Sequence, residues 1–333
     1  MEEERVDILL ATYNGEKYLK ELIQSILNQS YKNFRLIICD DCSTDKTLAI
    51  VSAFSKIDKR IVAFKTKSNV GVAGNFETLL KRVESPYFMF ADQDDVWKKD
   101  KILNSMNKIK EGYDLVYTDL EVSDESANVK YESYWKLKGL YNKIKKYNNF
   151  KSLYLNNYIT GCTIMCKSEW IEKVLPIPKG ADHVLHDYWL ALMVAQEGKL
   201  GYIEEPQIMY RQHKDNNVGT KKVSSEMETL DEIRDHFINV KIEHFQTFVD
   251  NNDKFIDDKT KELNQKALDY YRHLTYSKHF CFQRWGLFFS LYKYEDFKYM
   301  MENFLILNMP TIARIAFKIM KAKEAREANK AKG

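Results

Sequence analysis

Three carboxylates crowd a segment in the first third of the chain. Asp92, Asp94 and Asp95 lie within four residues of one another and directly follow the apolar run at residues 87–91. Ionised carboxylates this close repel one another unless a cation neutralises them, and ligands that offer only oxygen atoms suit Mg²⁺ or Mn²⁺. Such a metal ion needs an anionic substrate to share, typically a diphosphate. The alternative is a solvated acidic turn that caps the following helix.

Two further polar segments follow apolar runs. Asp40 and Asp41 end the second run, where a carboxylate can accept hydrogen bonds from the base or ribose of a nucleoside; their alternative role is helix capping. The first run ends in Thr12, Tyr13 and Asn14, which can present backbone N–H groups and an aromatic face to a nucleotide. This segment lacks the Gly-rich patterns of a dinucleotide fold and of a P-loop, which argues against a dehydrogenase or an NTPase.

Apolar runs alternate with segments of helical periodicity over the first 120 residues. We predict helices between short strands, including one helix at residues 75–84. The predicted strands are at residues 6–12, 34–39, 61–64 and 87–91. Strands separated by helices imply an α/β fold whose parallel sheet has right-handed crossovers. Because ligands of such sheets bind beyond the carboxyl ends of the strands, the three polar segments should share one edge.

Two regions are expected along the chain, residues 1–220 and residues 221–333. The second region reads as helical, and Ser225 with Glu228 has the capping-box spacing that would open its first helix. Within the first region, residues 123–147 are polar and lysine-rich, which indicates an excursion from the fold. The first region divides into a nucleotide-binding half at 1–120 and an acceptor half at 121–220.

Five segments, in consistent order and spacing, resemble the family 2 inverting glycosyltransferases of the GT-A fold. These segments are 6–14 (VDILLATYN), 25–31 (SILNQSY), 37–45 (IICDDCSTD), 69–71 (NVG) and 92–95 (DQDD). The match covers about the first 215 residues. Within the family, the sequence is similar to the rhamnosyltransferase-like branch that builds bacterial surface polysaccharides. The segments that carry this similarity are 91–97 (ADQDDVW), 186–192 (HDYWLAL) and 210–213 (YRQH). The resemblance implies a Rossmann-like mixed sheet flanked by helices, with a helical C-terminal extension.

The resemblance also implies roles for individual residues. Asp187 matches the general base, and the D-x-D motif is matched by Asp92-Gln93-Asp94. The expected metal ligands are Asp94, Asp92 and His213. The expected nucleotide-binding residues are Thr12, Tyr13, Asn14, Asp41, Asn69, Gly71 and Asp92. The expected donor and acceptor pocket is lined by Gly161, His186, Trp189 and Arg211. His186 stands where many members have Glu, and the absence of a Q-x-x-R-W motif argues against a processive synthase.

The expected chemistry agrees with these positions. Inverting transfer needs a base on the acceptor side to take the hydroxyl proton and a cation on the other side to stabilise the departing diphosphate. Asp187 lies in the predicted helix at 183–196, on a segment separate from the acidic cluster. Partial burial there would raise its pKa toward neutrality. The alternatives are an exposed carboxylate on an amphipathic helix for Asp187 and a solvated histidine for His213.

The sequence therefore predicts a Mn²⁺- or Mg²⁺-dependent transferase that moves a sugar from a nucleoside diphosphate to a glycan or lipid-linked oligosaccharide acceptor. The preferred donor, through the branch resemblance, is dTDP-rhamnose, with UDP-hexoses or UDP-N-acetylhexosamines as alternatives. A non-catalytic partner protein that binds nucleotide sugars is a second class of function. A sugar nucleotidylyltransferase would need a Gly-rich basic loop after the first strand, and residues 11–15 do not provide one.

Charge and composition limit the location and the partners. A net charge of +3 argues against a nucleic-acid binder, and no apolar run approaches the ~18 residues of a membrane span. The chain begins with acidic residues and not with an apolar leader, and its five Cys are an odd number, so we expect the reducing cytoplasm. We interpret the Cys as buried thiols and not as a zinc site. Residues 311–333 hold seven Lys or Arg against two Glu. This basic amphipathic tail could lie on the inner face of the membrane, or it could pack on the catalytic domain or a homodimer partner.

Overall fold

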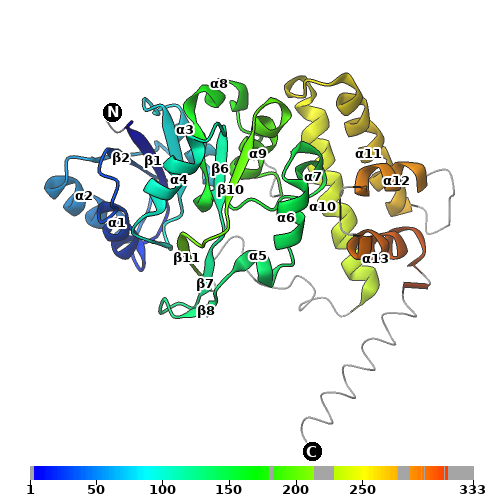
Figure 1. Ribbon diagram of the computed structural model, residues 1–333, viewed down its shortest axis with the longest axis horizontal. Coiled ribbons are helices and arrows are strands. Elements are labelled where there is room, and N and C mark those ends of the chain that lie inside the picture. Colours follow the sequence, from blue (N-terminus) through cyan, green and yellow to red (C-terminus); the bar gives the residue numbers. More distant parts are fainter. Residues whose placement is uncertain are drawn as a thin grey trace, which may run out of the picture. The chain divides into compact units, whose positions relative to one another are not determined.

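The computed structural model divides into two compact units, Met1–Asn217 and Val218–Gly333 (Figure 1). The residues it describes are 4–179, 183–213, 229–276, 285–293, 295, 297–310 and 312–313. We describe the two units separately.

A seven-stranded mixed sheet forms the centre of the first unit, with the strand order β10-β6-β9-β4-β1-β2-β3. Its strands are β1 (Val6–Thr12), β2 (Phe34–Asp40), β3 (Ile61–Lys65), β4 (Tyr87–Ala91), β6 (Leu115–Thr118), β9 (Met165–Lys167) and β10 (Leu200–Ile203). All neighbours pair in parallel except β9, which runs antiparallel to both β4 and β6. The central strands are buried on both faces, which is typical of parallel sheets. The predicted mixed α/β sheet is confirmed.

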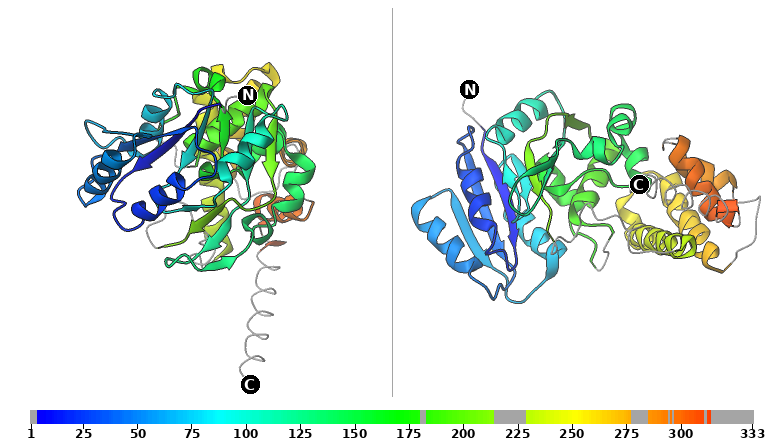
Figure 2. Two further views of the ribbon diagram at one scale, coloured as in Figure 1. Left: turned by 60° about the vertical axis from the view of Figure 1, so that its left-hand side comes forward. Right: turned by 90° about the horizontal axis from the view of Figure 1, so that it is seen from below.

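Helices cover both faces of this sheet (Figure 2). The main ones are α1 (Leu19–Leu27), α2 (Thr47–Ile57), α3 (Gly71–Leu80), α4 (Lys101–Ile109) and α9 (His186–Glu197). The shorter ones are α5 (Tyr134–Leu137), α6 (Tyr141–Tyr147), α7 (Phe150–Leu155) and α8 (Ile171–Val174). Helix α1 shows why the sequence folds this way: Leu19, Leu22, Ile23 and Ile26 recur on one face and are all buried.

Helix α3 begins four residues earlier than the sequence predicts, at Gly71 and not at residue 75. The backbone N–H groups of Val70 and Gly71 donate to the carboxylate of Asp41, at 2.9 and 2.8 Å. Asp41 therefore caps this helix from a distant position in the sequence. Gly71 has φ +73°, a conformation that favours glycine, so it can make the turn into the helix.

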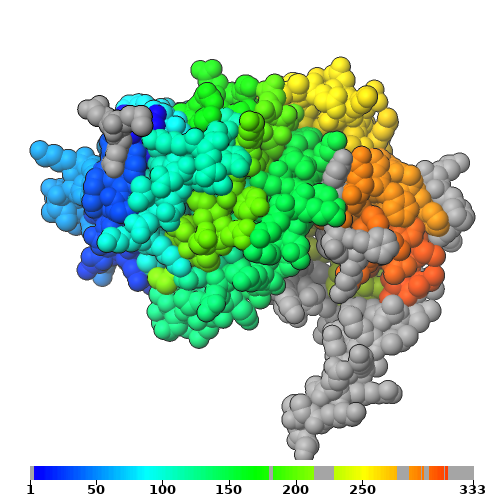
Figure 3. Space-filling model, viewed as in Figure 1, coloured from blue at the N-terminus to red at the C-terminus, as the bar shows by residue number. Residues whose placement is uncertain are grey.

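A second, four-stranded sheet has the order β5-β11-β7-β8. Its strands are β5 (Val96–Trp97), β11 (Ile208–Arg211), β7 (Glu121–Ser123) and β8 (Val129–Tyr131). The predicted excursion at residues 123–147 is wrong, because this segment contributes β8, α5 and α6 to the folded unit (Figure 3, blue-green to green). Strand β8 escaped prediction because all three of its residues are exposed and show no apolar alternation. The pairing of β5 with β11 brings residue 211 beside the acidic segment.

The second unit is helical, as predicted. It contains α10 (Leu230–Asp250), α11 (Asp258–Tyr276), α12 (Trp285–Tyr292) and α13 (Phe297–Asn308), and α10 contacts both α11 and α13. A capping box of Thr229 and Glu232 opens α10. The capping box predicted at Ser225 and Glu228, and all of the tail at 311–333 except residues 312–313, lie outside the described residues. None of the helices in the described part of the chain is long and apolar enough to cross a membrane.

Candidate functional site

Four parallel strands end at one edge of the main sheet and bring the polar segments together there. In the register of the sheet, Thr12 pairs with Asp40, Asp40 pairs with Lys65, and Leu10 pairs with Ala91. The acidic segment that follows Ala91 therefore lies next to the loop after β1, and Asp40 lies on the other side of that loop. This is the shared edge that the sequence predicts.

The loop after β1 is held rigidly by its neighbours. The Asn14 N–H donates to Ser43 Oγ at 2.9 Å, and Asn14 Oδ1 accepts the Thr44 N–H at 2.9 Å. Tyr13 exchanges two hydrogen bonds with Gln93: its N–H donates to Gln93 Oε1, and Gln93 Nε2 donates to its carbonyl, both at 2.9 Å. A Cβ at Gly15 would collide with the Gln93 amide, so a larger residue there would displace this side chain from its hydrogen bonds with Tyr13. The Tyr13 ring remains 48% exposed and can face a nucleotide base.

Asp41 directly follows β2 at the same edge of the sheet. Besides the two N–H groups at the start of α3, its carboxylate accepts the Thr66 hydroxyl at 2.9 Å, and the residue is buried. Thr12 is also buried and donates to Asp40 Oδ2. The side chains of Thr12 and Asp41 are thus held by protein partners at the sheet edge, and their contacts with a nucleotide stay a prediction. Asn69 and Gly71 are exposed with Tyr13 at the surface.

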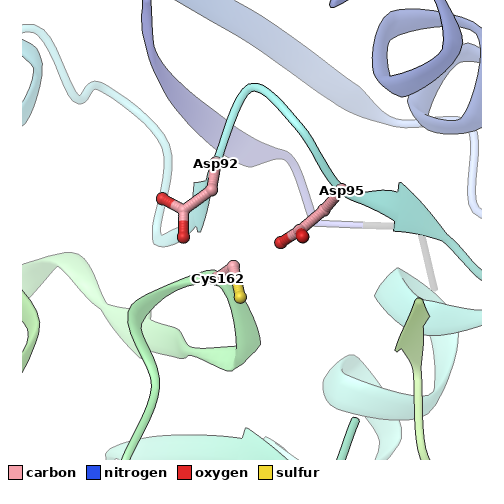
Figure 4. A group of neighbouring side chains, drawn as sticks. All are labelled: Asp92, Asp95 and Cys162. Carbon is pink, nitrogen blue, oxygen red and sulfur yellow. The ribbon is translucent and has the colours of Figure 1, made fainter. Parts of the chain in front are cut away.

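The acidic segment meets the 3-10 turn η1 (Gly161–Thr163) below the sheet edge. Ligand atoms of Asp92, Asp95 and Cys162 all lie within 4.8 Å of one another, and the two carboxylates of the acidic segment lie next to the Cys162 side chain (Figure 4). Asp95 is fully buried, and its Oδ2 has no hydrogen-bond partner among the described residues. Burial and the neighbouring carboxylates of Asp94 and Asp187 raise the pKa of Asp92 to about 7. Burial, Asp94 and Asp92 raise the pKa of Asp95 well above its ordinary value.

His213 contacts the same acidic segment. Its Nε2 lies 2.8 Å from Asp94 Oδ2, and both side chains are largely buried. The three predicted metal ligands therefore lie in one region of the structure. The crowded carboxylates, the orphaned oxygen of Asp95 and a single imidazole fit a divalent cation, since carboxylates suit Mg²⁺ and Mn²⁺ and an imidazole is tolerated by Mn²⁺.

Asp187 lies in the first turn of α9, close to the acidic segment. It is partly buried, and its charge contributes to the raised pKa of Asp92. The positive end of a helix stabilises an ionised carboxylate, and the Tyr188 N–H donates to Asp187 Oδ1 at 2.7 Å. Gly161 approaches so closely that an added Cβ would lie 3.0 Å from both Cβ and Oδ2 of Asp187. Gly161 thus lies directly beside the Asp187 carboxylate, and the absence of its side chain leaves room for that carboxylate.

The other three residues predicted to line the pocket, His186, Trp189 and Arg211, are buried, and their place in a donor and acceptor pocket stays a prediction. The ring of His186 stacks on Phe76 with 3.7 Å between centroids, and burial lowers its pKa to about 4. Trp189 is fully buried, and its indole donates to the Val174 carbonyl at 3.0 Å. Arg211 is buried beneath the acidic segment. All three side chains lie in the interior of the first unit.

Two residues beside the acidic segment, Cys162 and Lys101, were not predicted. Asp95 was recognised as part of the acidic segment but was not assigned as a metal ligand, and Cys162 reads in the sequence as an ordinary thiol of an apolar run. Lys101 carries no sequence signal, yet it is fully buried with Nζ 3.2 Å from the centroid of the Trp97 ring. Burial lowers the pKa of Lys101 to about 7, against the opposing effect of the nearby Cys162, Asp95 and Asp92.

Comparison with known proteins adds independent information. Residues 7–175 match the family model described as glycosyl transferase family 2. The chain is 32% identical over 221 residues to the dTDP-rhamnosyl transferase RfbG of Shigella flexneri, an alignment that covers 63% of this chain and 73% of that protein. It is 38% identical over 104 residues to the UDP-Glc:alpha-D-GlcNAc-diphosphoundecaprenol beta-1,3-glucosyltransferase WfaP of Escherichia coli, covering 31% of this chain and 41% of that one. Among solved structures, S. aureus TarS 1-349 in complex with UDP-GlcNAc is similar with a TM-score of 0.56 and 17% identity, covering 91% of this chain and 81% of that one.

Proposed function

This chain belongs to glycosyl transferase family 2, and from that premise we propose that it transfers rhamnose from dTDP-rhamnose to a bacterial surface glycan with inversion of the anomeric centre. Its fold is GT-A, and its enzyme class is a glycosyltransferase of polysaccharide synthesis that uses a nucleotide-sugar donor. The observation that carries the inverting reaction is the position of Asp187, a carboxylate on its own helix close to the acidic segment.

We assign Asp94, Asp92 and His213 as the residues that would hold a divalent cation, Mn²⁺ or Mg²⁺. When bound, such a cation supplies a Lewis acid that neutralises the departing nucleoside diphosphate. The short contact between Asp94 and His213 shows that these two side chains already converge. Asp95 lies deeper in the same acidic segment, beside Asp92 and Cys162.

Asp187 would act as the general base. As the acceptor hydroxyl attacks the anomeric carbon, Asp187 takes its proton, the new glycosidic bond forms, and the bond from that carbon to the diphosphate oxygen breaks with its electron pair. Asp187 lies in the first turn of α9, where the Tyr188 N–H donates to its Oδ1 at 2.7 Å and helps to orient the carboxylate. The space above Gly161 lets Asp187 take this position.

The donor nucleotide would bind along the sheet edge. Tyr13 offers an exposed ring for stacking on the base, and its backbone is fixed by Gln93 of the acidic segment. Asn69 and Gly71, held by Asp41, would close the other side of the nucleotide. This arrangement links the base-binding loop to the diphosphate-binding segment through a single side chain, Gln93.

A UDP-hexose or UDP-N-acetylhexosamine is the alternative donor, favoured by the 38% identity to the E. coli UDP-Glc enzyme. The rhamnose proposal takes precedence because the match to the Shigella protein combines length with identity, at 32% over 221 residues, whereas the E. coli UDP-Glc enzymes match at 38% over 104 residues or at 28% over 206. Both proposals use the same residues, so the choice depends on the donor alone.

The acceptor is proposed to be a lipid-linked oligosaccharide at the inner face of the cell membrane. The basic residues of 311–333 would favour an anionic membrane surface, and co-sedimentation with anionic liposomes, with and without these residues, tests this. Equal binding of both forms would refute membrane contact through the tail. It would leave packing on protein, in the monomer or in a homodimer, as its role.

A donor panel tests the proposed function. The full chain with Mn²⁺ is heated in the presence of dTDP-rhamnose, UDP-glucose or UDP-N-acetylglucosamine, and its melting temperature is measured. We expect the largest stabilisation from dTDP-rhamnose, and transfer of labelled rhamnose to alkyl-diphosphate-linked saccharides. Stabilisation by UDP-sugars only would overturn the rhamnose assignment.

A further inference from the structure

Arg211 ends β11 with its guanidinium buried at the meeting point of three segments. Its Nε donates to the Asp94 carbonyl at 2.9 Å, and its Nη1 donates to the Glu125 carbonyl at 2.6 Å. Its Nη2 forms an ion pair with Glu21 of α1. The same residue's backbone N–H donates to Asp95 Oδ1 at 3.3 Å. One side chain thus ties the acidic segment to α1 and to the turn after β7.

Stability alone does not account for the burial of the Arg211 guanidinium. The Arg211 side chain is only 3% exposed, whereas the side chain of Glu21, with which it forms an ion pair, is 53% exposed. Removing a charge from water costs several kcal/mol, and such pairs are often no more stabilising than apolar residues. The directional N–H groups of the guanidinium reach two carbonyl oxygens and a carboxylate together, which the point charge of a lysine cannot reproduce.

The ring of Tyr18 connects Arg211 to His213. The guanidinium carbon lies 4.7 Å from the centroid of this ring, and the His213 ring centroid lies 4.9 Å from it. His213 in turn contacts the carboxylate of Asp94. Asp94 is therefore held in two places. Arg211 binds its backbone carbonyl, and His213, which contacts the same Tyr18 ring as Arg211, binds its carboxylate.

We propose that Arg211 is a positioning residue that orients Asp94 and His213 for divalent cations without contacting either substrate. This inference rests on the proposed function, because it takes Asp94 and His213 as the cation ligands. It gives Arg211 a different role from the pocket lining that the sequence suggests. Loss of a side chain that orients metal ligands typically weakens metal affinity by about 10-fold to 100-fold.

The test measures Mn²⁺ binding directly, by the decrease of the free Mn²⁺ electron paramagnetic resonance signal on titration into the full chain with dTDP. In Arg211→Lys we expect the Mn²⁺ dissociation constant to rise about tenfold, with kcat at saturating Mn²⁺ changed far less. Glu21→Gln is the matched control. It removes the ion pair but leaves both carbonyl contacts, so its Mn²⁺ affinity should stay within about twofold of the wild type.

A second variant covers the case in which Arg211→Lys does not fold. Tyr18→Leu removes the ring that contacts both Arg211 and His213 and should also raise the Mn²⁺ dissociation constant several-fold. A cooperative thermal unfolding transition would show that this variant is folded. Wild-type Mn²⁺ affinity in a folded Arg211→Lys or Tyr18→Leu protein would overturn the positioning role and leave the proposed function standing. Absence of Mn²⁺ binding by the wild-type chain would refute both.

Discussion

Replacing Gly161 by alanine adds one methyl group against the carboxylate proposed as the base. The new Cβ would lie 3.0 Å from both Cβ and Oδ2 of Asp187. Non-bonded heavy atoms of this kind prefer about 3.5 Å, so Asp187 must move by roughly 0.5 Å. The turn η1 cannot easily yield instead, because its residues are buried against the sheet.

The expected effect of Gly161→Ala is on the chemical step. A catalytic group misplaced by ~1 Å can cost about 100-fold in rate, so a shift of half that size should lower kcat by about tenfold or more. The donor KM should stay close to the wild-type value, because the exposed rim at Tyr13 and Asn69 is on other segments.

Steady-state transfer of labelled sugar at saturating Mn²⁺ measures this split between kcat and KM. Gly286→Ala is the matched control, since an added Cβ at Gly286 meets no atom of the described residues within 4 Å, and its kcat should be unchanged. Wild-type kcat in Gly161→Ala would refute the reasoning that the position of Asp187 limits the reaction. A melting temperature close to that of the wild type in the variant excludes simple unfolding as the cause.

Three further outcomes are expected. Asp187→Asn should lower kcat by about 10²-fold to 10⁴-fold while dTDP-rhamnose still raises the melting temperature, and a fully active variant would remove Asp187 from the base role. Chelation of metal by EDTA should abolish transfer and excess Mn²⁺ should restore it; undiminished activity after dialysis against EDTA would contradict a metal requirement. Burial works to raise the pKa of Asp7, but hydrogen bonds from Arg35, from the Glu84 N–H and from Ser85 hold it below its ordinary value. The stabilisation that follows from this lowered pKa is fully present when the pH is above the pKa of Asp7 in the unfolded state. It is lost as the pH falls through the lower pKa of Asp7 in the folded state. Asp7→Asn should therefore lower the free energy of unfolding by ~3 kcal/mol at pH 7 and by less below about pH 4, and an equal loss in urea unfolding at both pH values would contradict the ion pair as its cause.

The residues that the sequence placed well are those fixed by local order along the chain. Asp92 and Asp94 directly follow an apolar strand, so the strand delivers them to the sheet edge whatever the rest of the fold does. Asp187 shares the first turn of its helix with His186, and the helical periodicity around it is visible in the sequence. Their roles in binding and catalysis remain proposals.

The features that escaped prediction depend on contacts between distant segments. Helix α3 starts at Gly71 because Asp41 supplies its cap from 30 residues earlier. Arg211 turns inward because β11 pairs with β5 and β7, and neither pairing leaves a periodic signal in such short strands. Trp189 looks like a sugar-stacking residue by type, but its indole finds a partner in the core at Val174.

The anomeric configuration of the product tests the central claim most directly. The full chain, dTDP-rhamnose, Mn²⁺ and a soluble diphosphate-linked acceptor are incubated, and the rhamnoside formed is examined by NMR through its one-bond carbon–hydrogen coupling at the anomeric position. A single displacement assisted by Asp187 gives a product whose anomeric configuration is opposite to that of the donor. A product with the donor's configuration would contradict the account.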